Sequence, residues 1–250
     1  MNLHRFLIRP YFYTRYGFHR LTGTGAFKPG RGRPVQTMVT PQSPPLKRAL
    51  WEHFVKQFHA SSCSVATVVS CVNAIRTLRN GNIRPISQFE ILDRVTTGHW
   101  KERMGDNGYR GRRGLPLPLL GQVVIDSLAA YGLDVQAVDI VRTPKNESPQ
   151  ATIRLTLKKR LRELDRIGNS LIIAHFDQGA FVPTLNIPHI SPVGAYDCKT
   201  DLVTVLDVDP EIEEPYQVDF NTFYKGLSAD YHQVLKAYGY GSGGYVYIKI

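Results

Sequence analysis

The sequence predicts an α+β fold, with a helical first half followed by an antiparallel β-sheet. Two observations predict it. Apolar residues recur at helical spacing through most of residues 63–167, whereas the apolar segments after residue 168 have the length and alternation of strands. Helices and strands that are segregated along a chain favour an α+β arrangement over repeated β-α units.

Helices are expected at Cys63–Leu78, Ser87–Val95, Leu117–Tyr131 and Gln150–Ile167. In the first, Val65, Val68 and Val72 lie on one face, and Ser61 and Ser62 precede it as cap candidates. The last two end at Gly132 and Gly168, because glycine takes the left-handed conformation that closes a helix. Between the second and third helices, Thr96–Gly114 is rich in glycine and arginine, which predicts a long functional or mobile loop.

The sheet is expected to contain five strands and to be interrupted by one short helix near Phe220–Leu227. The segment Asp197–Asp201 has the composition of a hairpin turn between the third and fourth of these strands. The strands are expected at Leu133–Ile140, Ser170–Phe176, His189–Tyr196, Leu202–Val208 and Gly244–Ile250.

Composition is that of a soluble globular protein, with 42% hydrophobic and 21% charged residues among 250. No apolar stretch approaches the roughly 18 residues of a membrane span, and no secretory signal is expected. Three cysteines do not form a disulfide framework, so a reducing cytoplasm is the expected location. The histidines lack paired metal-ligand spacing, so neither a metal nor another cofactor is expected.

The net charge of +10 belongs to the N-terminus. Residues 1–48 hold nine of the 31 Lys and Arg and no acid, which leaves 22 basic against 21 acidic residues in the rest. We expect a basic, extended arm or linker at 1–48 and a folded domain at 49–250. The arm could wrap the domain, serve as a transit peptide or dock on an acidic carrier protein. The near-neutral domain argues against nucleic acid as a partner.

A cysteine nucleophile is predicted at Cys63. A helix N-terminus and a nearby imidazolium both lower a thiol pKa, and Cys63 opens a helix. His189 begins one strand and Asp207 ends the next, so hairpin pairing brings them together as base and orienting acid. The order Cys, His, Asp is papain-like. Gln57 is the candidate oxyanion donor, while Cys71 is expected to pack in the core and Cys198 to be a bystander in the hairpin turn. Candidate substrate contacts are Ser64, His175, Asp177 and Tyr196.

These segments resemble the phytochelatin synthase family over roughly residues 50–250. The resemblance rests on Gln57–Ala66 (QFHASSCSVA), on His189–Tyr196 (HISPVGAY) with Leu206–Val208, and more weakly on Ala130–Val135 (AYGLDV). It implies a thioester acyl-enzyme on Cys63, proton relay by His189, orientation by Asp207 and oxyanion stabilisation by Gln57. The implied reaction expels glycine from glutathione and passes γ-glutamylcysteine to a thiol peptide or to water, as in the mostly hydrolytic, single-domain bacterial members.

The sequence departs from the family where the substrate carboxylate is held. No arginine lies between Ala174 and His189 or within Gly239–Gly244, and the segment after Asp207 is acidic (Asp209–Pro215). The loop arginines Arg110, Arg112 and Arg113 are candidates to compensate.

Three hypotheses follow from these features. The first is a thiol amidase or transpeptidase acting on a small γ-glutamyl thiol peptide. The second is an acyltransferase that condenses a carrier- or thioester-bound acyl group with an amine, which the acidic segment favours. The third is a non-catalytic protein that binds nucleic acid or another anionic surface through its basic arm.

Overall fold

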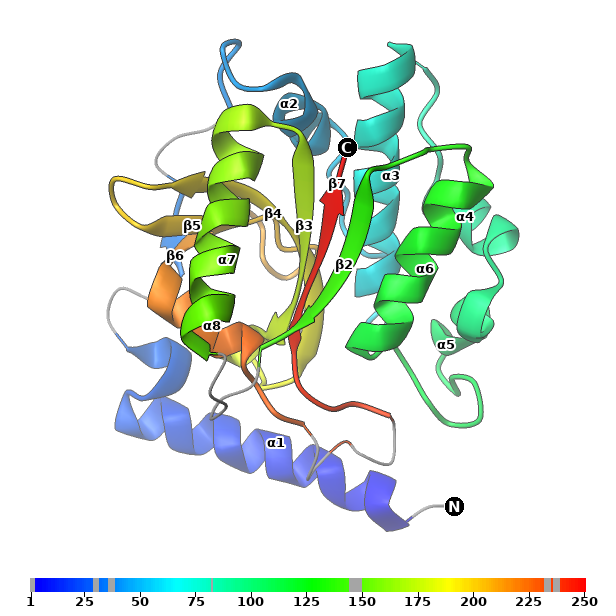
Figure 1. Ribbon diagram of the computed structural model, residues 1–250. Helices are drawn as coiled ribbons and strands as arrows, with labels where there is room; N and C mark the ends of the chain where they lie inside the picture. Colours follow the sequence, from blue (N-terminus) through cyan, green and yellow to red (C-terminus); the bar gives the residue numbers. More distant parts are fainter. Residues whose placement is uncertain are drawn as a thin grey trace.

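The computed structural model describes residues 3–28, 32–35, 39–81, 83–143, 150–231, 235 and 239–250. A seven-stranded sheet has the order β1-β6-β5-β4-β3-β7-β2, and all neighbouring strands are antiparallel (Figure 1). The α+β class is therefore confirmed. The strands are β1 (Arg33–Pro34), β2 (Ala137–Arg142), β3 (Ser170–Asp177), β4 (Pro188–Asp197), β5 (Leu202–Val205), β6 (Tyr216–Asp219) and β7 (Gly244–Lys249).

One face of the sheet packs on helices from the first half of the chain. The central one is α3 (Cys63–Asn80), which is flanked by α2 (Pro45–Glu52), α4 (Gln88–Arg94) and α6 (Leu117–Ala130) (Figure 1). Apolar residues of α3 and α6 share a core with alternate residues of β3 and β7. Because this core surrounds α3, its residues from Cys63 to Ile75 are all buried. The predicted helical first half is confirmed.

The opposite face is covered by α7 (Gln150–Arg162) and α8 (Phe220–Leu227). Leu157 and Leu161 of α7 share a second core with Ile172 and Phe176 of β3. A π-helical turn, Glu163–Ile167, extends α7 to a left-handed Gly168, as the sequence predicts. The sheet is thus a middle layer between two sets of helices.

Residues 96–114 are more ordered than the predicted loop. They include a 3-10 turn (Thr97–His99) and α5 (Trp100–Arg103). Trp100 is fully buried, and its Nε1–H donates to the Ser64 hydroxyl at 2.9 Å. This bond fastens the segment to the first turn of α3.

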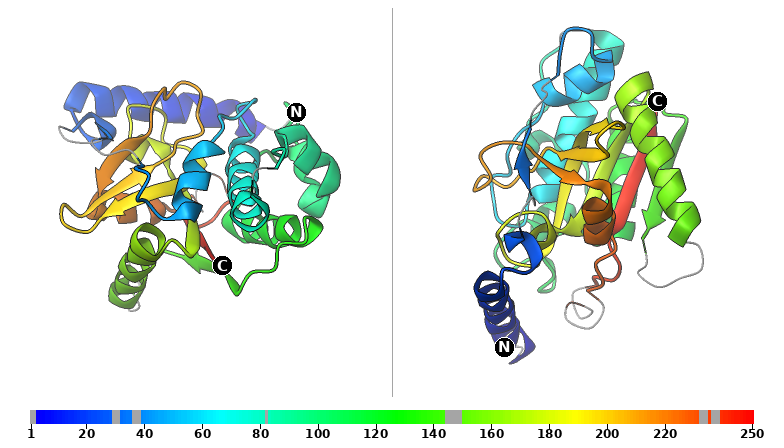
Figure 2. Two further views of the ribbon diagram at one scale, coloured as in Figure 1. Left: turned by 90° about the horizontal axis from the view of Figure 1, so that it is seen from above. Right: turned by 90° about the vertical axis from the view of Figure 1, so that its left-hand side faces the viewer.

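The N-terminal segment is not the extended arm that its composition predicts. Residues Leu3–Thr22 form the helix α1, which runs past one end of the sheet (Figures 1 and 2). Phe12 is buried in a cluster with Ala229, Tyr231 and Leu235. Since α2 begins at Pro45, it spans the predicted domain boundary at 48/49. In the described part of the chain, no helix has the length and apolarity that crossing a membrane requires.

Candidate active site

Cys63 is the first residue of α3 and is 8% exposed. The turn before it is fixed by Ser62, which bonds through its amide and its hydroxyl to the His59 carbonyl, each at 2.9 Å. Ser62 holds the N-cap position, but its side chain makes no capping bond to the helix. The Val65 N–H donates to the Ser62 carbonyl at 2.9 Å. The N–H groups of Cys63 and Ser64 and the helix dipole therefore favour negative charge where the sulfur lies.

His189 and Asp207 meet as the predicted hairpin requires. His189 lies at the start of β4, which pairs with β5 across the Asp197–Asp201 turn. Strand β5 ends at Val205, so Asp207 lies two residues beyond the strand rather than at its end. Asp207 nevertheless accepts a hydrogen bond from Nε2 of His189 at 2.7 Å, and the two side chains are 0% and 5% exposed.

The Cys63 sulfur acts on the same imidazole and raises its pKa. Because Nε2 faces Asp207, the nitrogen left for Cys63 is Nδ1. Burial lowers the pKa of His189, but the Asp207 carboxylate and the Cys63 sulfur outweigh it and raise that pKa to about 10. The raised pKa keeps His189 an imidazolium at neutral pH, which is the partner that a cysteine nucleophile requires.

The Asp207 carboxylate has further partners that the sequence did not indicate. Tyr216, on β6, donates its hydroxyl to Oδ2 at 2.8 Å, and the Asp209 amide donates to Oδ1 at 3.0 Å. Burial raises the pKa of Asp207, but His189 and these donors together hold it below its usual value. Lys56 donates to the backbone carbonyl of Asp207 at 2.7 Å. No sequence motif predicts that Tyr216 or Lys56 contacts Asp207, because tertiary packing brings each of them there.

Gln57 lies beside the same segment. Its backbone N–H donates to the Val208 carbonyl at 2.8 Å, which ties it to the residue after Asp207. Its side-chain Oε1 is buried with no hydrogen-bond partner among the described residues. The assignment of its amide to an oxyanion remains a prediction.

Two of the four candidate substrate residues lie near this cluster on β3. The His175 ring packs 5.9 Å from the Tyr240 ring, and the charge of His189 acts on it. Asp177 is 8% exposed, and Asn186 donates to both of its oxygens at 3.0 and 3.1 Å. Both side chains lie next to the site, but little of either is exposed to solvent.

The other two candidates, Ser64 and Tyr196, are not positioned to contact a substrate at this site. Ser64 is fully buried and its hydroxyl is turned to Trp100. Tyr196 lies on β4 seven residues from His189, roughly 23 Å along the strand. It donates its hydroxyl to Asp201 at 2.6 Å.

The loop arginines approach the nucleophile from the other side. Arg113 donates from Nε to the Ser61 hydroxyl at 2.6 Å, two residues before Cys63. Arg110 instead lies over the Tyr109 ring, 5.2 Å from its centroid. Within the described residues, no three His, Cys, Asp or Glu side chains are placed to share a metal ion.

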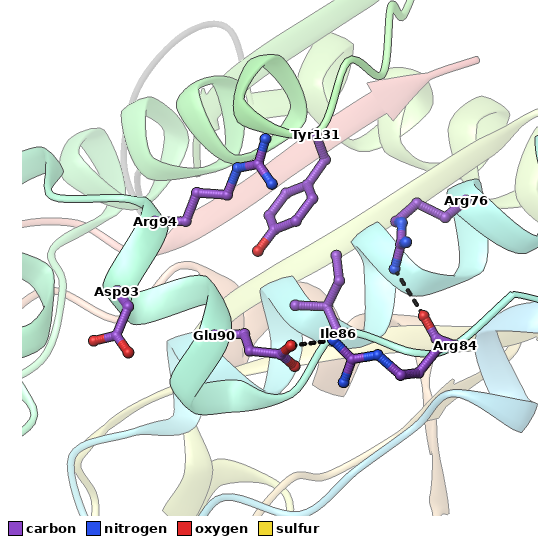
Figure 3. Close-up of a pocket in the computed structure, with 7 residues that line it drawn as sticks. All are labelled: Arg76, Arg84, Ile86, Glu90, Asp93, Arg94 and Tyr131. Carbon is purple, nitrogen blue, oxygen red and sulfur yellow. Dashed lines mark hydrogen bonds and ion pairs between the residues drawn. The ribbon is translucent and has the colours of Figure 1, made fainter.

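A separate groove of about 530 Å³ lies at the far end of α3 (Figure 3). Arg76 and Arg94 lie 5.8 and 4.5 Å from the centroid of the Tyr131 ring, and Arg84 pairs with Glu90. Arg76 is 13 residues from Cys63 along the helix, roughly 20 Å. These contacts join α3, α4 and α6 and play no part in the cysteine site.

Comparison with known proteins assigns the chain to a family. A search of curated proteins finds no match to the chain. The family model described as phytochelatin synthase matches residues 46–240, a span that includes Gln57, Cys63, His189 and Asp207. The chain therefore belongs to the phytochelatin synthase family, a family of cysteine-dependent γ-glutamylcysteine transpeptidases and hydrolases.

Proposed function

We propose that this protein uses Cys63 to cleave the amide bond after a γ-glutamylcysteine group and to transfer that group to a thiol peptide or to water. The observation that carries the proposal is the buried set of Cys63, His189 and Asp207, in which His189 is hydrogen-bonded to Asp207 and its pKa is raised by the Cys63 sulfur. Glutathione is the expected acyl donor, and glycine is the expected leaving group.

The first half-reaction follows from the protonation states that this geometry favours. The thiolate of Cys63 attacks the amide carbonyl and forms the carbon–sulfur bond of a tetrahedral intermediate. Gln57 and the N–H groups of the first turn of α3 stabilise the oxyanion. His189 gives its proton to the amine nitrogen as the carbon–nitrogen bond breaks, so glycine leaves as a neutral amine and a thioester remains on Cys63.

The second half-reaction reverses the proton flow. The acceptor, an amine of a thiol peptide or a water molecule, loses a proton to His189 as it attacks the thioester. The carbon–sulfur bond then breaks and restores the thiolate–imidazolium pair. Asp207 keeps the imidazole in one tautomer through both steps, because its carboxylate accepts the Nε2–H.

The test is incubation with glutathione, followed by mass spectrometry of the intact protein and of the products. We expect glycine release and a γ-glutamylcysteinyl adduct on the wild-type chain, and neither with Cys63→Ala. Cys198→Ser is the matched control because Cys198 lies in the distant hairpin turn. Retention of the adduct by Cys63→Ala, or no glycine release at any pH from a folded wild-type chain, contradicts the proposal.

A second candidate keeps the nucleophile and changes the substrates. Glu211, Glu213 and Glu214 are exposed in the segment that follows Asp207, and an acidic surface favours an amine acceptor. In this alternative, Cys63 takes an acyl group from a thioester and passes it to an amine. Incubation with a simple acyl thioester and a diamine distinguishes the two: amide formation without any turnover of glutathione favours the alternative.

A further inference from the structure

Three arginines lie together beside Cys63, and no ion pair with a carboxylate involves them in the described part of the chain. They are Arg103, Arg112 and Arg113, here called the arginine cluster. The two acids of the same segment lie near histidines instead: Asp106 is 3.1 Å from His59, and Glu102 is 3.8 Å from His99. Among the described residues, the positive charge of the cluster is therefore not compensated by an ion pair.

The loop that carries Arg112 and Arg113 has a fixed conformation. Tyr109 and Arg112 exchange two backbone hydrogen bonds, of 3.0 and 2.9 Å. Gly108 has a φ of 58°, and a Cβ there would lie 2.4 Å from the Arg112 carbonyl oxygen. The turn thus depends on glycine and holds the arginines in one place, which lowers the entropy lost when they bind a ligand.

Arg113 is held next to the turn that precedes Cys63. Its Nε–H donates to the Ser61 hydroxyl at 2.6 Å, and Ser61 is 7% exposed. This bond uses one of the guanidinium donors and leaves the terminal amino groups, which form the fork that grips a carboxylate.

Tyr240 connects the cluster with the sulfur. Its hydroxyl donates to the Arg113 carbonyl at 3.3 Å. Burial raises the pKa of Tyr240, the Cys63 charge raises it further, and the charges of Arg103 and Arg113 lower it. One hydroxyl therefore lies within electrostatic range of the nucleophile and of two arginines, which places the arginine cluster at the edge of the reaction site.

Arg103 adds a buried charge to this edge. Its side chain donates to the Gly98 carbonyl at 2.8 Å and to the Gly114 carbonyl at 3.4 Å, and the residue is 7% exposed. Burial, and after it the charge of Arg112, lower its pKa. A buried guanidinium whose acceptors are neutral carbonyls keeps much of its desolvation cost, which a bound anion would offset.

The opposite side of the site repels anions. Asp177 is the last residue of β3 and Asp209 follows β5, the two strands that pair with β4, and the exposed acids of residues 211–214 continue from Asp209. A carboxylate is therefore repelled on the sheet side and attracted on the loop side.

We propose that the arginine cluster binds a carboxylate of the acyl donor beside the thiolate that attacks it. This inference rests on the proposed function and specifies its substrate class: a peptide-like donor with a free carboxylate rather than a neutral acyl chain. The carboxylate is held from the helix-side loop, since no arginine precedes His189 on the sheet side between residues 170 and 188.

A pair of alkylating reagents tests the site without any substrate. Iodoacetate and iodoacetamide both react as the Cys63 thiolate forms a carbon–sulfur bond and iodide leaves, but only iodoacetate carries a carboxylate. We expect Arg113→Gln to lower the iodoacetate-to-iodoacetamide rate ratio about tenfold, the effect of one charge-assisted hydrogen bond. Arg110→Gln, in the same loop, should leave the ratio unchanged.

The iodoacetamide rate reports whether the thiolate and the fold survive each substitution. Arg112→Gln is a second variant at an exposed position and should lower the ratio about two- to threefold. An unchanged ratio in Arg113→Gln with a normal iodoacetamide rate overturns the inference, as does an equal fall in Arg110→Gln. If Arg113→Gln does not fold, an unchanged ratio in Arg112→Gln overturns it.

Glutathione analogues then identify which carboxylate is bound. One analogue lacks the α-carboxylate of the γ-glutamyl residue, and the other is amidated at glycine. One of them should lose kcat/KM about tenfold with the wild-type chain but not with Arg113→Gln. Equal kcat/KM values for both analogues and glutathione overturn the inference. Failure of glycine release alongside a shifted alkylation ratio would refute glutathione cleavage and leave the anion site standing.

Discussion

Nε2 of His189 lies 2.7 Å from Oδ1 of Asp207, and both side chains are almost completely excluded from solvent. Burial alone would make this histidine neutral. The carboxylate, together with the Cys63 sulfur, reverses that preference and raises the pKa of His189 to about 10. The charge of the His189 imidazole, on which the proposed reaction depends, is therefore set largely by Asp207.

Replacing Asp207 with Asn should test that dependence. We expect kcat to fall by a factor on the order of 10³–10⁴, because the amide no longer favours the charged imidazole or its working tautomer. With the carboxylate gone, burial lowers the pKa of His189. The alkaline limb of the kcat/KM profile, which reports loss of the imidazolium, should then move to lower pH.

Asp209→Asn is the control for this measurement. Asp209 lies two residues away, and its side chain accepts a bond from Gln178 at 2.9 Å rather than from His189. Its alkaline limb should stay where the wild-type limb lies. The same position of the limb in Asp207→Asn would contradict the assignment of Asp207 as the orienting acid.

Tyr216 is predicted to position Asp207 rather than to contact substrate. Tyr216→Phe removes the 2.8 Å hydrogen bond to Oδ2 and leaves that buried oxygen short of a donor. We expect a loss of about 1–3 kcal/mol in the free energy of unfolding, measured with urea, and about a tenfold lower kcat with KM nearly unchanged. Tyr224→Phe is the matched control, because the Tyr224 hydroxyl is buried with no partner among the described residues. An equal loss of stability in both variants would contradict the prediction.

The parts of the fold that local sequence determines were predictable. The helix at Phe220–Leu227 and the hairpin turn at Asp197–Asp201 agree with the structure, because periodicity and turn composition act over a few residues. The hairpin then places His189 beside Asp207 without any further information. Cys63 opens α3 as expected, because the apolar periodicity that defines the helix begins there.

Features that depend on distant packing could not be predicted. The segment Leu3–Thr22 has no acidic residue and contains Pro10, yet it is helical. Its Phe12 packs in a cluster with residues some 220 positions later in the chain, a contact that local sequence does not indicate. Strand β6 is four residues long and follows an acidic, proline-containing segment, so its pairing with β5 gave no local signal. Ser64 adjoins the nucleophile in sequence, but the rotation of α3 against Trp100 turns it away.

His175 should make the protein sensitive to acid. Burial is the main cause that lowers its pKa, from 6.5 to about 4, and the backbone at Leu115 and His175 only partly opposes it. Between those pH values the unfolded chain binds a proton that the folded chain excludes. The free energy of unfolding should therefore fall as pH falls from 6.5 to 4, by up to about 3 kcal/mol.

Urea unfolding of the wild type and His175→Phe at pH 4.5 and pH 7 measures this contribution. The variant should lose less stability on acidification than the wild type. The neighbouring His189 stays charged throughout this range, because its pKa is raised, and so it does not produce the same effect. An identical fall in both proteins would show that His175 is not buried in its neutral form.

Phe12 should determine whether α1 stays docked. Its ring is 7% exposed in a cluster with Tyr231 and Leu235, and Tyr240 of the active-site edge packs against the same cluster. Phe12→Ala should cost about 3 kcal/mol of docking free energy, because it leaves a cavity under the helix. Hydrogen exchange should then increase through residues 8–22, and the iodoacetamide rate at Cys63 should change as Tyr240 loses support. Phe18→Ala, on the same helix but 61% exposed, should change neither measurement. Equal exchange in the two variants would mean that α1 is held by contacts other than Phe12.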